Sequence, residues 1–275
     1  MIPLKDNVPT GRFPLVTVIL ILINVCAFAW QLTLPDDHAS SADLLRAGVS
    51  ERDQATIEYG AIPFRITHPG SECGVAPGEI ACGEDGVVET GGSTGSPLPD
   101  DLDAPPWWVT LITAMFLHAG FLHIGFNMLF LWIFGNNVED AMGRGRFLLF
   151  YLLAGLVASY AQAALDTSAT VPSIGASGAI AGVLGAYAIL HPRARVLSLI
   201  FIVFFVTLIE VPALVLLAAW FILQFVPAVG QVASTNVTGG GVAYLAHVGG
   251  FVFGLAAIRL FARRRGLTGG RTPVY

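Results

Sequence analysis

The sequence has few charged residues. Asp, Glu, Lys and Arg make up 12% of its 275 residues, whereas soluble globular domains carry about 25%. Hydrophobic residues make up 55%, and the mean hydropathy is +0.71. This composition excludes an ordinary soluble domain and indicates a membrane protein with several spans. The sequence also lacks a basic stripe and any nucleic-acid-binding motif, so we expect no nucleic acid among its partners.

Cysteine is scarce as well, with three residues in the chain. Cys26 lies within an apolar run and is expected to pack there. Cys73 and Cys82 lie in a polar segment rich in glycine and proline, where an extracytoplasmic pair can form a disulfide. Two free thiols or a metal-binding pair are the alternatives. No nearby histidine spacing supports a metal, and we expect none.

Long apolar runs, in contrast, recur along the chain. A transmembrane helix needs roughly 20 apolar residues. The first run is longer than a signal-peptide core and has no clear cleavage site, so we expect it to be retained. We therefore predict an all-α, polytopic membrane bundle of six transmembrane helices. The six runs are Leu15–Leu34, Leu122–Met142, Phe147–Leu165, Ser177–Leu190, Pro212–Ala228 and Ala243–Phe261.

One more apolar stretch, Val196–Ile209, is separated from the fifth run by Glu210 and Pro212. A short helix, a re-entrant segment and the beginning of the fifth span all fit its composition. Its structure is left open.

These runs divide the chain into five parts. A tail of residues 1–14 precedes the first helix, 15–34, and a long polar loop covers 35–106. Residues 107–262 form a core of five further helices, followed by a basic tail, 263–275.

The basic residues orient the bundle. Cytoplasmic segments of membrane proteins are rich in Lys and Arg. If residues 1–14 are cytoplasmic, eleven of the fourteen basic residues lie on the cytoplasmic side, and only Arg46, Arg52 and Arg65 lie outside, in the long loop. The Ser177 end of its helix and the loop Gly239–Gly241 before His247 then face the outside. The eleven are Lys5, Arg12, Arg144, Arg146, Arg193, Arg195, Arg259, Arg263, Arg264, Arg265 and Arg271.

Ser177 and His247 are polar residues inside glycine-rich apolar helices. Polar groups at that depth are energetically costly, which makes them candidates for a functional role. Ser177 lies in the sequence Gly-Ala-Ser-Gly, and small neighbours let a substrate backbone approach a nucleophile. Tight helix packing explains such a serine equally well, and a structural hydrogen bond would explain the histidine.

Two pairs of small residues provide a way for these helices to meet. Gly178 and Gly182 form a G-x-x-x-G pair in the Ser177 helix, and Gly250 and Gly254 form another in the His247 helix. Such pairs allow close backbone approach. If the two helices pack together, Ser177 and His247 come within hydrogen-bond reach, as a nucleophile and its base require.

A polar cluster near the start of the second span adds possible donors. His123 and Asn127 are four residues apart and share one helix face. Both side chains can donate hydrogen bonds to a developing oxyanion, and hydrogen bonds between helices are the simpler explanation. For His118 we expect a structural or water-contacting role.

These pieces together resemble the rhomboid family of intramembrane serine proteases. The likeness runs from about Trp107 to Phe261. It rests on His118, His123 and Asn127 in the second span, Gly175-Ala176-Ser177-Gly178 opening the fourth, and Ala246-His247-Val248-Gly249-Gly250 in the sixth. Val138–Gly145 also resembles the turn that follows the family's second span.

The resemblance implies a chemistry for each residue. Ser177 would be the nucleophile and His247 the base, without the carboxylate of soluble serine proteases. His123, Asn127 and the backbone N–H of Ser177 would form the oxyanion hole. No cofactor is implied. The loop Gly230–Gly241 and the fifth span would form the gate to the site.

This chain differs from the family pattern in three places. Many members carry Trp-Arg ahead of the second span, where this chain has Trp107-Trp108. Some members place an aromatic residue four positions after the serine, where it stacks on the histidine. That position is Ala181 here, so His247 must be held in another way. The long first loop is a further difference.

The resemblance also implies partners and location. The substrates would be single-pass or polytopic membrane proteins, cut in or beside a transmembrane segment. A catalytically silent relative that binds client helices is the alternative. A small-solute transporter would show inverted repeats, which this sequence lacks. We expect a multi-pass protein of a bacterial plasma membrane, with its site open to the extracytoplasmic side.

Overall fold

The structure is a computed structural model of the whole chain. It describes residues 1–36, 49–76, 79–83, 87–90, 93–97, 104–202, 205–233 and 242–262. The basic tail 263–275 and most of the expected gate loop, 234–241, lie outside the described residues.

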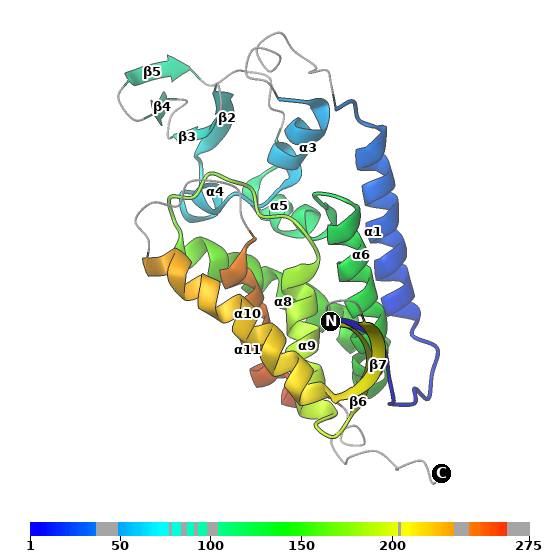
Figure 1. Cartoon of the computed structure of the whole chain (residues 1–275). Coiled ribbons are helices and arrows are strands. Elements are labelled where there is room, and N and C mark those ends of the chain that lie inside the picture. Colours follow the sequence, from blue (N-terminus) through cyan, green and yellow to red (C-terminus); the bar gives the residue numbers. More distant parts are fainter. Residues whose placement is uncertain are drawn as a thin grey trace.

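Helices make up most of the described chain (Figure 1). The main helices are α1 (Leu15–Thr33), α6 (Phe121–Phe130), α7 (Asn136–Met142), α8 (Arg144–Leu165), α9 (Ser177–Leu190), α10 (Ala213–Ala233) and α11 (Tyr244–Phe261). The π-helical turn η2 (Leu131–Gly135) joins α6 to α7. Shorter helices are α3 (Glu51–Tyr59), α4 (Pro63–Thr67), α5 (Trp107–Thr113) and η1 (Ala114–Phe116). The strands are β1 (Ile2–Asp6), β2 (Glu72–Ala76), β3 (Glu79–Gly83), β4 (Val87–Thr90), β5 (Ser93–Pro97), β6 (Arg195–Ile202) and β7 (Phe205–Pro212).

Five helices of the described chain are long and apolar enough to cross a membrane. They are α1, the continuous helix Phe121–Met142, α8, α10 and α11. The sixth expected span, α9, has only 14 residues, or about 21 Å of helix. The chain is thus a polytopic helical membrane protein, as predicted, and the count of six spans stays a prediction.

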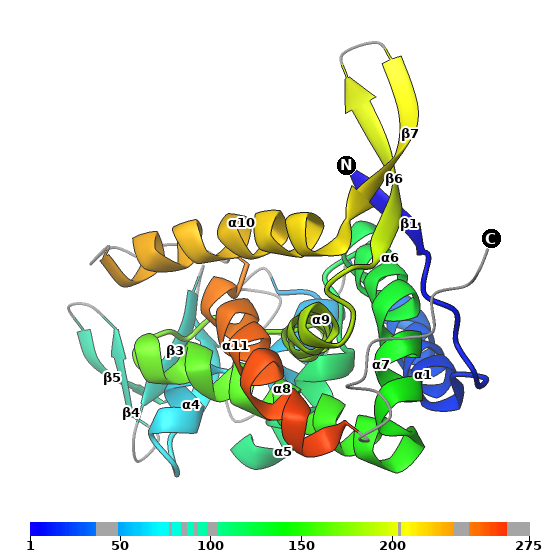
Figure 2. The same ribbon diagram turned by 90° about the horizontal axis from the view of Figure 1, so that it is seen from below.

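The short helix α9 forms the centre of the bundle. Twelve of its 14 residues are buried, and α8 and α11 pack against it (Figure 2). Small residues make this packing close. A Cβ added to Gly178 would lie 2.6 Å from Ala158 Cβ in α8. One added to Gly250 or Gly254 in α11 would overlap the carbonyl oxygen of Gly178 or Gly182.

The apolar stretch after α9 forms a β-hairpin. Strands β6 and β7 pair antiparallel from Arg195↔Pro212 to Ile202↔Phe205, and β1 pairs with β6 on the other side. The stretch is therefore neither a short helix nor the beginning of the fifth helix, and the re-entrant alternative stays a prediction. A short run of mostly β-branched and aromatic residues fits a strand as well as a helix, and here it pairs both with itself and with residues 2–6 of the chain.

This end of the molecule, called the hairpin end because β6 and β7 lie there, contains a buried polar network. The Tyr187 hydroxyl donates to Asp6 Oδ2 over 2.6 Å, and Asn137 Nδ2 donates to the same oxygen over 2.7 Å. Burial raises the pKa of the Asp6 carboxyl. The network ties the segment 1–14, expected to be a cytoplasmic tail, to α7 and α9.

Glu139 of α7 caps the first helix. The preceding Pro14 provides no side-chain cap for α1. The Glu139 carboxylate instead accepts hydrogen bonds from the N–H groups of Val16 and Thr17, at 3.0 and 2.8 Å, and from the Thr17 hydroxyl at 2.8 Å. A buried carboxylate is favourable at the N-terminus of a helix, where the N–H groups lack partners.

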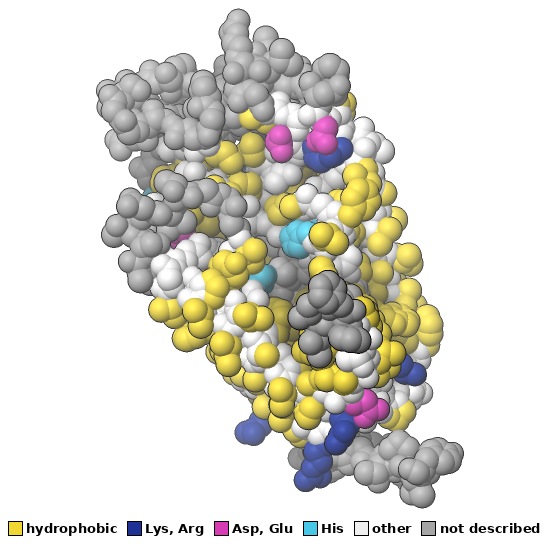
Figure 3. Space-filling view, in the orientation of Figure 1, with side chains coloured by type: hydrophobic (Ala, Val, Ile, Leu, Met, Phe, Trp, Pro, Cys, Tyr) yellow, Lys and Arg dark blue, Asp and Glu magenta, His cyan; other side chains and the backbone are white. Residues whose placement is uncertain are grey.

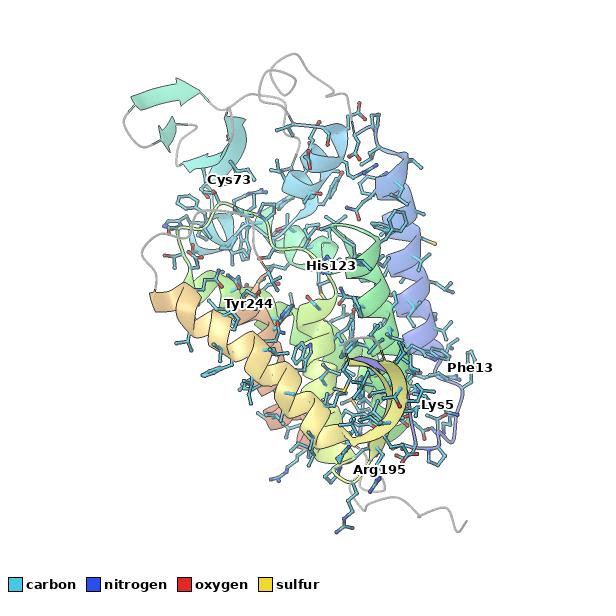
Figure 4. The ribbon with its side chains drawn as sticks, viewed as in Figure 1. Lys5, Phe13, Cys73, His123, Arg195 and Tyr244 are labelled. Carbon is cyan, nitrogen blue, oxygen red and sulfur yellow. A yellow bond between two sulfur atoms is a disulfide. The ribbon has the colours of Figure 1, made fainter. Side chains whose placement is uncertain are left out.

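The described part of the long first loop lies at the opposite end, called the loop end. Figure 4 shows Cys73 at this end and Arg195 at the other, with His123 between them. Cys73 and Cys82 are paired across β2 and β3 and form a disulfide. Helix α3 begins with a capping box between Ser50 and Asp53.

Candidate active site

Ser177 and His247 are in direct contact. His247 Nε2 lies 2.7 Å from Ser177 Oγ, although the two residues are 70 positions apart in the sequence. Ser177 opens α9 and His247 lies in the first turns of α11. The close packing of the two helices at Gly178, Gly182, Gly250 and Gly254 brings the side chains together.

The turn before α9 sets the position of the serine. Gly175 has φ +117°, a conformation that only glycine adopts without strain. Its N–H donates to the Ala114 carbonyl over 2.8 Å, which fixes the turn to η1. A Cβ at Gly175 would lie 2.8 Å from His123 Nε2 and 3.7 Å from Ser177 Oγ. Any larger residue at this position would therefore collide with the His123 ring beside the serine.

His247 is held from α10. Its Nδ1 lies 2.8 Å from Gln224 Oε1, and its ring packs at 5.9 Å from the Trp220 ring. Ala181, the position where some rhomboids carry an aromatic residue, is fully buried. The sequence patterns did not indicate Gln224 or Trp220 as residues of the site. Gln224 is a polar side chain within the apolar run Pro212–Ala228, and this is the same signal that drew attention to Ser177.

His123 and Asn127 lie beside the serine on α6. The N–H of Ala119 points to His123 Nδ1 at 3.3 Å. A ring nitrogen that accepts a hydrogen bond carries no proton, so in the neutral ring the proton lies on Nε2. Asn127 Nδ2 donates to the His123 carbonyl over 2.9 Å. One hydrogen of this amide is thus committed to its own helix, and the second stays available.

His118 is buried next to this group. Its ring lies edge-on to that of His123 at 5.0 Å, and the backbone N–H of His118 donates to Gln31 Oε1 of α1 over 2.9 Å. Burial lowers the pKa of His118, which precedes α6, to about 4. The ring is therefore neutral near pH 7. Its contacts join α1 to the turn before α6.

All four expected residues line one cavity of about 880 Å³ between α6 and α10. Figure 3 shows histidine side chains in a hollow that hydrophobic side chains border. Within the described chain no group of three or more His, Cys, Asp or Glu could hold a metal ion. The cavity lining includes His123, Phe126, Asn127, Ser177, Ile180, Trp220, Gln224 and His247.

Comparison with known proteins identifies the family. The profile of the rhomboid domain matches residues 105–264, more than half of the chain. The chain belongs to the rhomboid family. Its integral, multi-pass character agrees with this assignment, and the matched segment contains every residue of the cavity.

Relatives of this rhomboid include proteins named as proteases. Rhomboid protease GluP of Bacillus subtilis is 50% identical over 80 residues, which cover 29% of this chain and 15% of the relative. Rhomboid protein 1, mitochondrial, of Saccharomyces cerevisiae is 34% identical over 152 residues, or 54% of this chain and 40% of the relative. Putative rhomboid protease YdcA of Bacillus subtilis is 40% identical over 85 residues, which cover 30% of this chain and 40% of the relative. The matches span less than half the length of each relative.

Proposed function

We propose that this rhomboid is an intramembrane serine endopeptidase with Ser177 as nucleophile and His247 as general base. The observation that carries the proposal is the 2.7 Å hydrogen bond between Ser177 Oγ and His247 Nε2. A serine is a weak nucleophile unless an adjacent base removes its proton. The dyad also lines a cavity large enough for a peptide segment.

In the proposed reaction, Ser177 Oγ attacks a substrate carbonyl while its proton moves to His247 Nε2. The resulting tetrahedral intermediate collapses, and His247 gives the proton to the leaving amine. Water then attacks the acyl-enzyme, with His247 again as the base, and releases the second product. The reaction needs no metal or organic cofactor.

In the proposed reaction, three hydrogen-bond donors stabilise the oxyanion. The N–H of Ser177 belongs to the first turn of α9, whose N–H groups have no partner within the helix. The first intrahelical hydrogen bond at this end runs from the Ile180 N–H to the Ala176 carbonyl. His123 Nε2 and the second hydrogen of the Asn127 amide are the other two donors. The cavity that Ser177, His123 and Asn127 line provides the space for the reacting carbonyl.

The proposed substrates are transmembrane segments of membrane proteins. A membrane helix has all of its backbone groups hydrogen-bonded internally, so it must unwind before its carbonyl can be attacked. Segments with helix-weakening residues near the cut should therefore be preferred. We further propose a bacterial plasma membrane, with the loop end and Ser177 on the extracytoplasmic side.

The decisive experiment uses the purified protein in lipid vesicles with a single-span substrate. Ser177→Ala and His247→Ala should each abolish cleavage. Ser168→Ala and His68→Ala, at the loop end and outside the cavity, serve as matched controls and should cleave like the wild type. Cleavage that survives both dyad substitutions would refute the proposal. An inactive wild type that still binds substrate helices would favour the silent, client-binding alternative.

A further inference from the structure

The Ser177–His247 pair uses only Nε2 of the His247 ring and gives Nδ1 no role. We propose that Gln224 is a positioning residue that fixes the proton of His247 on Nδ1. This inference rests on the proposed function, because it concerns the base of that reaction. It adds a third member, a neutral amide, to the Ser177–His247 pair.

The argument starts from the number of protons on a neutral imidazole. The ring carries one N–H, so one nitrogen donates and the other accepts. His247 Nε2 must accept the Ser177 proton, and the N–H must then be on Nδ1. Gln224 Oε1, 2.8 Å from Nδ1, is an acceptor suited to that N–H.

The opposite orientation of the amide would disable the base. If the Gln224 NH₂ group faced His247, it would donate to Nδ1, and the ring proton would move to Nε2. His247 would then donate to Ser177 Oγ and could not remove its proton. The orientation with Oε1 toward the ring is the one that leaves Nε2 free to act as a base.

Helix α10 also restrains the plane of the ring. Trp220 and Gln224 are four residues apart and therefore lie on the same helix face. The Trp220 ring packs against both His247, at 5.9 Å, and Phe251, at 6.1 Å. Helix α9 provides no aromatic contact at Ala181. In this rhomboid the restraint on the base therefore comes from α10 and not from the helix that carries the serine.

The test replaces Gln224 with side chains of similar length. Gln224→Met removes the acceptor, and Gln224→Glu keeps one. Leu223→Met, on the exposed face of the same helix, is the control. For each variant we would measure thermal unfolding, kcat and KM on a single-span substrate, and the ¹⁵N chemical shifts of the His247 ring, which distinguish the two tautomers.

We expect the wild type to show the Nδ1–H tautomer. In Gln224→Met the spectrum should contain both tautomers, and kcat should fall about tenfold with little change in KM, since one neutral hydrogen bond is lost. Gln224→Glu should keep the Nδ1–H tautomer and a kcat within about threefold of wild type. Leu223→Met should match the wild type throughout.

The inference and the proposed function fail in different ways. A folded Gln224→Met protein that keeps the wild-type tautomer and kcat would overturn the role of Gln224, as would a folded Gln224→Glu protein impaired as strongly as Gln224→Met. An inactive Ser177→Ala variant would support the Ser177–His247 dyad whatever the Gln224 variants show. Conversely, a wild type that cleaves nothing would refute the proposed function, and the tautomer spectra would still decide the role of Gln224.

Discussion

The contact between α9 and α11 predicts a strong effect of one added methyl group. In Gly254→Ala, the new Cβ would overlap the carbonyl oxygen of Gly182 and lie 3.0 Å from the Ala186 nitrogen. Both are backbone atoms of α9, so no side chain can rotate away. Ordinary contact between such atoms begins near 3.5 Å, and the two helices must separate by more than about 1 Å to reach it.

The magnitude follows from this separation. Overpacking in a well-packed interior costs about 1–3 kcal/mol. His247 precedes Gly254 by two helical turns, or about 10 Å, on the same face of α11. A separation of roughly 1 Å would stretch the 2.7 Å dyad bond beyond about 3.5 Å, where a hydrogen bond is lost. Stability and serine reactivity should therefore fall together.

The assay compares Gly254→Ala with Gly125→Ala. Gly125 lies in α6, where an added Cβ meets nothing within 4 Å, so alanine there should be neutral or stabilise by about 0.5–1 kcal/mol. Thermal unfolding in detergent measures stability, and the rate of Ser177 labelling by a fluorophosphonate measures the dyad. Wild-type labelling and stability in Gly254→Ala would refute the packing argument, and so would an equal loss in Gly125→Ala.

Two further predictions concern the polar groups at the hairpin end. Glu139→Gln should lower the unfolding free energy by about 1–3 kcal/mol, because an amide cannot satisfy all the donors at the start of α1. The control is Asp140→Asn, since the Asp140 carboxylate accepts only one N–H, from Gly11. An equal loss of stability in denaturant titrations of the two variants would contradict the capping role of Glu139. Burial raises the pKa of Asp6 in the folded protein above its ordinary value of 3.8, so the folded state binds the Asp6 proton more tightly than the unfolded state. The protonated carboxyl therefore contributes fully to stability below pH 3.8, and this contribution is lost as the pH rises through the folded-state pKa. Asp6→Asn should remove that part of the pH dependence, and stability curves of the wild type and the variant that stay parallel across this range would show the reasoning to be wrong.

The long apolar helices were predictable because each is a local property of the sequence, whereas the short helices α3, α4 and α5 were not predicted. The run predicted at Ser177–Leu190 has the bounds of α9, and Leu15–Leu34 differs from α1 by one residue. In a membrane, a long apolar run that ends at Pro35, Gly143 or a basic residue has few structures open to it other than a spanning helix. The contact of Ser177 with His247 could also be anticipated, since the glycine pairs indicated which helices meet.

The parts that were not predicted depend on distant contacts. The hairpin β6–β7 has an apolar composition that fits a helix equally well, and its pairing with β1 is not visible in the local sequence. Gln224 belongs to no motif, and its importance appears only when α10 is placed beside His247. The Asp6–Tyr187 bond joins residues 181 positions apart.

That last bond has a consequence for how the protein is made. Strand β1 precedes its partners in α9 and β6 by 181 or more residues, so it is translated well before them. At about 5–20 residues per second, Asp6 waits roughly 10–40 s for Tyr187. Until then the Asp6 carboxyl has at most Asn137 of its two donors, and the edge of β1 has no partner strand. The three-stranded sheet can therefore close only after the whole of α9 and β6 has been translated.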